Sequence, residues 1–229
     1  MNSKRKQYVL ALCLLPAALL LSGLAVQSAR AACTANGNGS LSCTDGASTI
    51  SSGPTITVGS ATNTSGNVYA IDTPNLTAAQ GASISINGRT IVNNNQYPAG
   101  DLATAGNNVG IYLRNLVGGT GDLSLTMSGT NSVTTARGTG ILVNNRGTGT
   151  GTATISGILT VHSTWNKSLE GQDGVEVSTV SGKASLDMSQ ATGSITVDGG
   201  GKAFCFAPGT LAPTPPAGVS QGISVLASI

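Results

Sequence analysis

The chain has few residues that could carry out chemistry, and only one of them is a histidine. A serine or cysteine nucleophile usually needs a histidine base, and His162 is the single candidate. It stands in an alternating apolar stretch beside Trp165. We interpret His162 as an outward-facing strand or turn residue rather than a catalytic base.

Three acidic residues, Glu170, Asp173 and Glu176, stand close together. Paired carboxylates can cleave a glycosidic bond, so a carbohydrate-active β-helix enzyme using the cluster 170–176 is the alternative function. These residues lie in a Gly-flanked loop entering a strand, where solvated turn residues are expected. A row of aromatic residues for sugar stacking would favour the enzyme, and the sequence has one Trp. We therefore predict that the protein is not an enzyme and has no catalytic residues.

Two glycine-rich segments bear on metal and cofactor binding. The segment 118–125 (GGTGDLSL) is similar to the nonapeptide repeat that binds Ca²⁺, but it occurs once, and Asp122 directly follows the last Gly. The segment 147–154 (GTGTGTAT) has neither a following Lys nor a following helix to hold a phosphate. We expect no metal site and no cofactor.

The N-terminus has the pattern of an export signal. Lys4, Arg5 and Lys6 precede an uncharged run over 8–26, and 29–31 reads Ala-Arg-Ala, an A-x-A cleavage site. The run is long enough to span a bilayer, so a retained anchor is the alternative. A lipoprotein attached at Cys33 is another, although Arg30 stands where an aliphatic residue is usual. The sequence predicts cleavage after Ala31.

Export favours an oxidising compartment, where cysteines can pair. Cys33 and Cys43 flank a short Gly/Asn/Ser turn, so we predict a disulfide between them. Cys205 lies between two Phe residues and reads as a buried free thiol, with a bond to one of the other two as the alternative.

Composition excludes two classes of protein. The 229 residues include 32 Gly, with 9% charged and 3% aromatic residues and a net charge of +2. Removal of Lys4, Arg5, Lys6 and Arg30 with the signal leaves seven basic and nine acidic residues, a net charge of −2. No basic patch remains for nucleic acid. A chain so poor in charge and rich in Val, Ile and Thr is also not typical of disorder.

Short period-two runs recur in a fixed order. A small residue before an apolar alternation opens each unit, at positions 70, 110, 140, 174 and 222, which are 40, 30, 34 and 48 residues apart. The second strand of a unit is expected at 82–86, 122–127, 152–156 and 184–188, and the third at 90–92, 131–135, 158–162 and 194–198. Such periods indicate a solenoid.

These patterns predict an all-β fold, a right-handed parallel β-helix that follows the cleaved signal peptide. Ile111, Ile141 and Val175 should form one interior row, and Asn107-Asn108 and Asn144-Asn145 should hydrogen-bond up the stack. The expected division of the chain is a signal peptide 1–31, an N-terminal cap 32–47 with Cys33 and Cys43, β-helix repeats 48–206, a Pro-rich loop 207–218, and the start of a further, incomplete coil 219–229.

The export signal, the segment ACTANGNGSLSCTDG directly after it, and the Gly/Asn/Thr/Ser-rich x-G-I-x-V coils together resemble the N-terminal passenger of a bacterial autotransporter, with its pertactin-like β-helix. The resemblance implies type V secretion and an exported surface protein, adhesive or structural. Its ligand would lie on a host cell, the matrix or a neighbouring cell.

The family displays its passenger through a C-terminal outer-membrane β-barrel, which this sequence lacks. The aromatic residues after the signal are scattered and form no girdles: Tyr69, Tyr97, Tyr112, Trp165, Phe204 and Phe206. We expect a fragment or a truncated autotransporter, with no stable membrane insertion of this segment. Within a full-length autotransporter the same residues would be at the cell surface or outer membrane.

Expressed as this chain alone in a Gram-negative host, the protein should be processed after Ala31 and accumulate in the periplasm, because nothing in it offers a lipid-facing band. N-terminal sequencing should read Ala32 first, and fractionation should place the chain with soluble proteins. Recovery in the outer membrane, resistant to carbonate extraction, would contradict the prediction.

Overall fold

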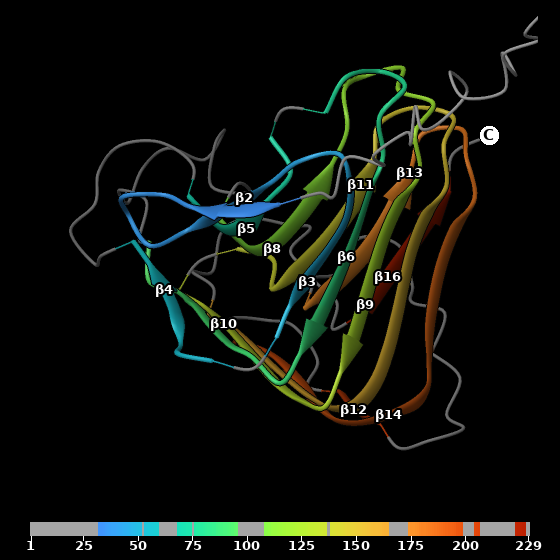
Figure 1. Cartoon of the computed structure of the whole chain (residues 1–229). Helices are drawn as coiled ribbons and strands as arrows, with labels where there is room; N and C mark the ends of the chain where they lie inside the picture. Colours follow the sequence, from blue (N-terminus) through green and yellow to red (C-terminus); the bar gives the residue numbers. More distant parts are fainter. Residues whose placement is uncertain are drawn as a thin grey trace, which may run out of the picture.

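The computed structural model describes residues 32–51, 53–59, 68–74, 76–95, 108–136, 138–164, 174–198, 204–206 and 223–227. These residues form sixteen β-strands and no helix, most of them in parallel pairs (Figure 1). Within them, no helix is long and apolar enough to cross a membrane. The prediction of an all-β fold is confirmed. The predicted signal peptide, its cleavage site after Ala31 and the Pro-rich loop 207–218 lie outside the described residues.

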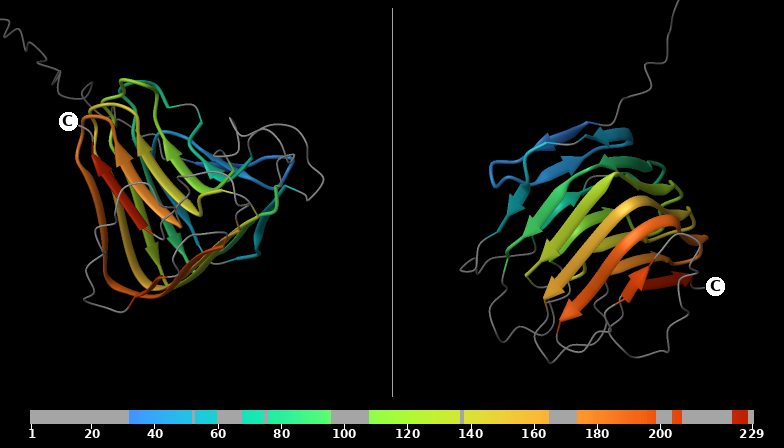
Figure 2. Two further views of the ribbon diagram at one scale, coloured as in Figure 1. Left: turned by 180° about the vertical axis from the view of Figure 1, so that it is seen from behind. Right: turned by 90° about the horizontal axis from the view of Figure 1, so that it is seen from below.

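Seven strands form sheet A, in the spatial order β1-β2-β5-β8-β11-β13-β16. Their bounds are β1 Cys33–Ala35, β2 Leu41–Cys43, β5 Tyr69–Asp72, β8 Val109–Arg114, β11 Ile141–Asn145, β13 Val175–Thr179 and β16 Ile223–Ala227. All pairs are parallel except β1 with β2. Each strand therefore lies beside the equivalent strand of the next repeat, which Figure 2 shows as a ladder running in chain order.

Sheet B has two wings that meet in two long strands. One wing contains β3 Gly46–Ile50, β6 Ala82–Asn87 and β9 Leu123–Ser128, and the other contains β4 Ile56–Val58, β7 Thr90–Asn93 and β10 Thr130–Thr135. β12 (Gly151–Thr164) pairs with β9 through its first residues and with β10 through its last. β14 (Ala184–Asp198) follows β12, and β15 (Phe204–Phe206) pairs antiparallel with β14. The predicted second and third strands of each unit are present, but in β12 and β14 they are continuous.

The core consists of aliphatic rows that cross the sheets. Ile71, Ile111, Ile141 and Val175 stand in register on sheet A and are fully buried, so the predicted row of Ile111, Ile141 and Val175 is confirmed. The second wing of sheet B contributes a similar row: Ile91, Val133, Val161 and Ile195. Burying each such side chain stabilises the fold by roughly 1.5–3 kcal/mol, so the core needs no aromatic side chains.

The small residue that opens each unit lies where sheet A approaches the second wing of sheet B. A Cβ atom on Gly110 would lie 2.6 Å from Val133 Cγ1 and 2.6 Å from the Gly140 carbonyl oxygen. Gly140 meets Val161 and Gly174 in the same way one unit later. A side chain at Gly110 or Gly140 therefore has no room, whereas in the first unit the equivalent position holds the buried Ala70.

A second glycine column makes the bend between the wings of sheet B. Gly88, Gly129 and Gly157 occupy equivalent places in successive units, because the strand residues before them are paired in register. Their φ angles are 64°, 71° and 79°. This left-handed conformation favours glycine. In β14 the residue paired with Gly157 is Ala191, and the register shifts just before it, so the bend is made there by a bulge.

Asparagine side chains tie neighbouring units together at a turn. Asn115 Nδ2 donates to Asn145 Oδ1 at 2.9 Å, and Asn145 Nδ2 donates to the Gly121 and Thr150 carbonyls at 2.9 Å each. The prediction that Asn145 bonds up the stack is confirmed. Asn108 also bonds to the preceding unit, since its Oδ1 accepts from the Val68 amide at 3.2 Å and from Asn95 Nδ2 at 2.7 Å. Asn107 lies outside the described residues.

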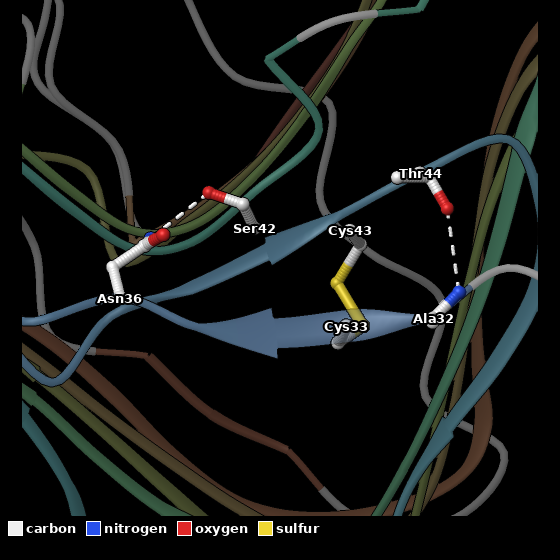
Figure 3. Close-up of a disulfide and its surroundings, with 6 residues drawn as sticks. All are labelled: Ala32, Cys33, Asn36, Ser42, Cys43 and Thr44. Atoms are coloured by element: carbon white, nitrogen blue, oxygen red, sulfur yellow. Dashed lines mark hydrogen bonds between the residues drawn. A yellow bond between two sulfur atoms is a disulfide. The ribbon is translucent and has the colours of Figure 1, made fainter.

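The hairpin β1–β2 covers the first edge of sheet A. Its strands pair Cys33 directly with Cys43, whose sulfurs form a disulfide at 2.03 Å (Figure 3), as predicted. Asn36 Nδ2 donates to Ser42 Oγ at 2.9 Å across the hairpin (Figure 3). β3 begins at Gly46, one residue before the predicted end of the cap, because the Gly46 amide already donates to the Gly81 carbonyl of the next unit at 2.9 Å.

Gly110→Ala should destabilise the protein by about 1–3 kcal/mol, because the new methyl group must displace Val133 or the Gly140 backbone. The matched control is Gly37→Ala in the hairpin turn, where a Cβ atom would meet nothing within 4 Å. Its stability should stay within about 0.5 kcal/mol of the parent. Urea unfolding measures both variants, and equal midpoints would contradict the close approach.

Candidate functional site

Four charged or aromatic side chains meet on the outer face of sheet A. They come from two neighbouring strands, β5 and β8, and we call them the Tyr–Arg cluster: Tyr69, Asp72, Tyr112 and Arg114. Among the residues whose side chains the structure describes, Arg114 and Asp72 form the one ion pair. The cluster is therefore the main concentration of functional groups in the described structure.

The strand alternation of β8 positions the cluster. Ile111 and Leu113 point into the core and are fully buried, so Tyr112 and Arg114 between and after them point outward. The parallel pairing of β5 with β8 places Asp72 directly beside Tyr112. Residues about 40 positions apart in the chain thus share one surface.

The two tyrosine rings and the guanidinium pack together. The ring centroids of Tyr69 and Tyr112 are 5.0 Å apart at an interplanar angle of 61°, an edge-to-face arrangement. Arg114 Cζ lies 5.0 Å from each centroid, within the range of a cation–π interaction. These contacts hold both rings in a fixed orientation.

Asp72 holds the guanidinium from its other side. Arg114 Nη2 donates to Asp72 Oδ2 at 2.7 Å and Arg114 Nε donates to Asp72 Oδ1 at 3.0 Å, a bidentate pair. The Arg114 side chain is 27% exposed and that of Asp72 is 9% exposed. Thr73 Oγ1 accepts from the Arg114 amide at 2.8 Å and donates to the Arg114 carbonyl at 2.7 Å. The pair is thus preorganised and still reaches solvent through Arg114.

Burial and charge shift the pKa values of the cluster in different directions. Burial raises the pKa of Asp72, and the hydrogen bond and charge of Arg114 only partly oppose this. Burial alone would lower the pKa of Arg114, but Asp72 outweighs it and the pKa is raised. Burial also raises the pKa of Tyr112, against the charge of Arg114. At neutral pH the tyrosine is a neutral hydroxyl beside a charged guanidinium.

The outer face continues along sheet A beyond the cluster. The register aligns Tyr112 with Leu142 on β11 and Glu176 on β13, and aligns Arg114 with Asn144. Glu176 is half-buried, and burial raises the pKa of its carboxyl, with Ser178 opposing the shift. Glu176 is therefore the sequence-predicted acidic candidate that shares a surface with the Tyr–Arg cluster.

The other candidates are placed as follows. Glu170 and Asp173 lie outside the described residues. His162 is an exposed residue of β12, as the strand pattern predicts. Asp122 accepts from the Thr150 amide at 2.7 Å, and this hydrogen bond lowers its pKa, so its carboxylate stabilises a turn. No group of three metal-ligating residues occurs in the described parts of the chain.

Cys205 stands in β15, where its backbone pairs with Ser194.

Sequence reasoning missed the Tyr–Arg cluster and treated the tyrosines as scattered, which is wrong for Tyr69 and Tyr112. A signal was present in β8, where the positions between buried aliphatic residues are Tyr and Arg. Finding their partners would have required the exact register between β5 and β8, which spacing of 40 residues alone leaves undetermined.

Comparison of the chain with protein-family models, with curated proteins and with solved structures finds no match.

Glu176→Gln should remove a pH-dependent loss of stability. Because burial raises the pKa of Glu176 in the native state above its ordinary value of 4.5, the carboxyl stays protonated to a higher pH in the native state than in the unfolded state. The protonated carboxyl therefore contributes to the free energy of unfolding in full below the pKa that Glu176 has in the unfolded state. This contribution is lost as the pH rises through the pKa that Glu176 has in the native state. As the pH rises above about 4.5, the free energy of unfolding of the variant should therefore fall less than that of the parent, as measured by urea unfolding.

Asp187→Asn is the matched control with the opposite sign. Hydrogen bonds from Ser189 lower the pKa of Asp187, so its contribution is present above the unfolded pKa and disappears as the pH falls. This variant should be less stable to urea than the parent at neutral pH, and the two proteins should be equally stable in acid. A Glu176→Gln profile parallel to that of the parent would show that the carboxyl is well solvated.

Proposed function

We propose that the chain is an exported, passenger-type surface protein with an adhesive or structural role, built as a right-handed parallel β-helix. The observation that supports this best is the repeated parallel pairing in register on sheet A and on both wings of sheet B. Right-handed crossovers are the rule for parallel strands joined in this way.

The repeats favour an extended scaffold. Each unit contributes one strand to sheet A and one to each wing of sheet B, and contacts mainly the units before and after it. Proteins of this kind grow in length by adding units and expose long continuous faces. Such faces suit a molecule that spans a distance or meets another surface.

The outer faces also suit exposure outside the cell. The first wing of sheet B presents almost only small hydroxyl side chains in register, among them Ser83, Ser124 and Thr152 in one row. The hairpin at the first edge is held by the Cys33–Cys43 disulfide, a bond that persists in oxidising compartments. Together with the export pattern of residues 1–31, these features support a role at the cell surface.

A carbohydrate-active enzyme is the second candidate, and one observation favours it. Glu176 has a pKa raised by burial, as a general acid requires, and it shares a row with Tyr112. Glycoside cleavage usually needs two carboxylates a few ångströms apart. Asp72, the other carboxylate of this face, is already paired with Arg114, so we favour the non-enzymatic role.

Display of residues 32–229 on a bacterial carrier, fused to a heterologous surface anchor, tests the adhesive role. Carrier cells should be retained several-fold more on epithelial monolayers, on immobilised fibronectin or on one another than cells displaying an unrelated domain of equal size. Retention equal to that control on all three surfaces would contradict an adhesive function. Release of reducing ends from polysaccharides, abolished by Glu176→Gln, would support the enzyme instead.

A further inference from the structure

We propose that Asn38, at the tip of the hairpin β1–β2, is an acceptor for an N-linked sugar that a glycosyltransferase delivers from a phosphate-activated donor. The chain reads Asn38-Gly39-Ser40 at this point. Asn-x-Ser/Thr, with x other than Pro, is the acceptor sequence of N-glycosylation and marks a surface loop in a secreted protein. The inference goes beyond the proposed function and rests on it only for the export of the chain.

The tip of the hairpin has room for a sugar. Asn38 and the glycines on either side of it are exposed, and a Cβ atom on Gly37 would meet nothing within 4 Å. β1 ends at Ala35 and β2 begins at Leu41, so Asn38 takes part in no strand pairing. A bulky substituent on its side chain would therefore leave the sheets and the core unchanged.

Ser40 supplies the hydroxyl of the acceptor sequence and already contacts the acceptor side chain. Its Oγ donates to Asn38 Oδ1 at 2.7 Å, and its amide donates to the same oxygen at 3.1 Å. Ser40 is 6% exposed, so its hydroxyl is held in place by the hairpin. Donors fixed at Oδ1 stabilise the negative charge that the carboxamide gains as its nitrogen loses a proton.

The nitrogen of the Asn38 carboxamide is available for the transfer. Both hydrogen bonds at this side chain are accepted by Oδ1, and Nδ2 donates to no partner among the residues that the structure describes. A glycosyltransferase can therefore reach Nδ2 without breaking a bond that holds the hairpin.

The transfer is a substitution at the anomeric carbon of the sugar. A bond forms between Asn38 Nδ2 and this carbon, while the bond between the carbon and a phosphate oxygen of the donor breaks. The electron pair of the broken bond leaves with the phosphate, and the amide proton passes to a basic group of the glycosyltransferase. Nothing is oxidised or reduced.

Asn36, in the same turn, is a natural comparison. The residue two positions after it is Asn38, so it has no hydroxyl at the required place. Its Nδ2 donates to Ser40 Oγ at 2.7 Å and to Ser42 Oγ at 2.9 Å, the second of which is drawn in Figure 3. Asn36 should therefore stay unmodified.

Treatment of the purified full chain with UDP-glucose and a soluble N-glucosyltransferase specific for Asn-x-Ser/Thr tests the inference. Three other acceptor sequences begin at Asn63, Asn75 and Asn166, which lie outside the described residues, so the starting protein carries Gln at these three positions. Peptide mapping should find one hexose, on Asn38 and not on Asn36. Ser40→Thr, which keeps the hydroxyl, should retain the transfer, whereas Ser40→Ala should lose it.

An unmodified Asn38 in the folded starting protein would overturn the inference, as would equal modification of Ser40→Ala. The Cys33–Cys43 disulfide, found in the same peptide map, shows that a variant has kept its hairpin. Should Ser40→Ala lose this disulfide, Asn38→Gln changes only the exposed tip and should take up no hexose; uptake equal to that of the starting protein would place the sugar elsewhere and overturn the inference. A chain that is modified at Asn38 but not exported would support the acceptor site and contradict only the export.

Discussion

Parallel pairing in exact register is the constraint on which the rest of the structure depends. Because side chains alternate between the two faces of a strand, a slip of one residue between units would turn Ile111, Ile141 and Val175 out of the core. The glycine corner at Gly110 and Gly140 reinforces this register, since a side chain one position away would meet Val133 or Val161. The core is therefore specified by repetition rather than by large side chains.

The same register creates the outer surface. Once Ile111 and Leu113 face inward, Tyr112 and Arg114 must face outward, and β5 then brings Tyr69 and Asp72 against them. The cluster is thus a by-product of stacking two units whose outward residues differ from the Ser and Thr of sheet B. Outward side chains can differ from unit to unit without changing the packing of the core, so one face can carry aromatic and charged groups.

Much of the fold follows from the sequence, and less of the site does. The interior row, the strand positions, the opening small residues and the Cys33–Cys43 pairing could be predicted, because each rests on local alternation or short spacing. The continuity of β12 and β14 could not, since Gly157 reads as a turn residue until its left-handed φ is seen as a bend within one strand. The Tyr–Arg cluster depends on register across about 40 residues, which varies from unit to unit.

Spin-label distances along one outward row measure the stacking most directly. Thr49, Ser85, Thr126, Thr154 and Asp187 stand in register on successive strands. The labels are introduced in a protein that carries Cys205→Ser and keeps the native disulfide. The backbone distance between Thr49→Cys and Thr154→Cys should be about 14 Å, and that between Thr49→Cys and Asp187→Cys about 19 Å. An increase of about one strand spacing between the two pairs is the expected result. Equal distances, or a second pair closer than the first, would contradict stacking of the units in register.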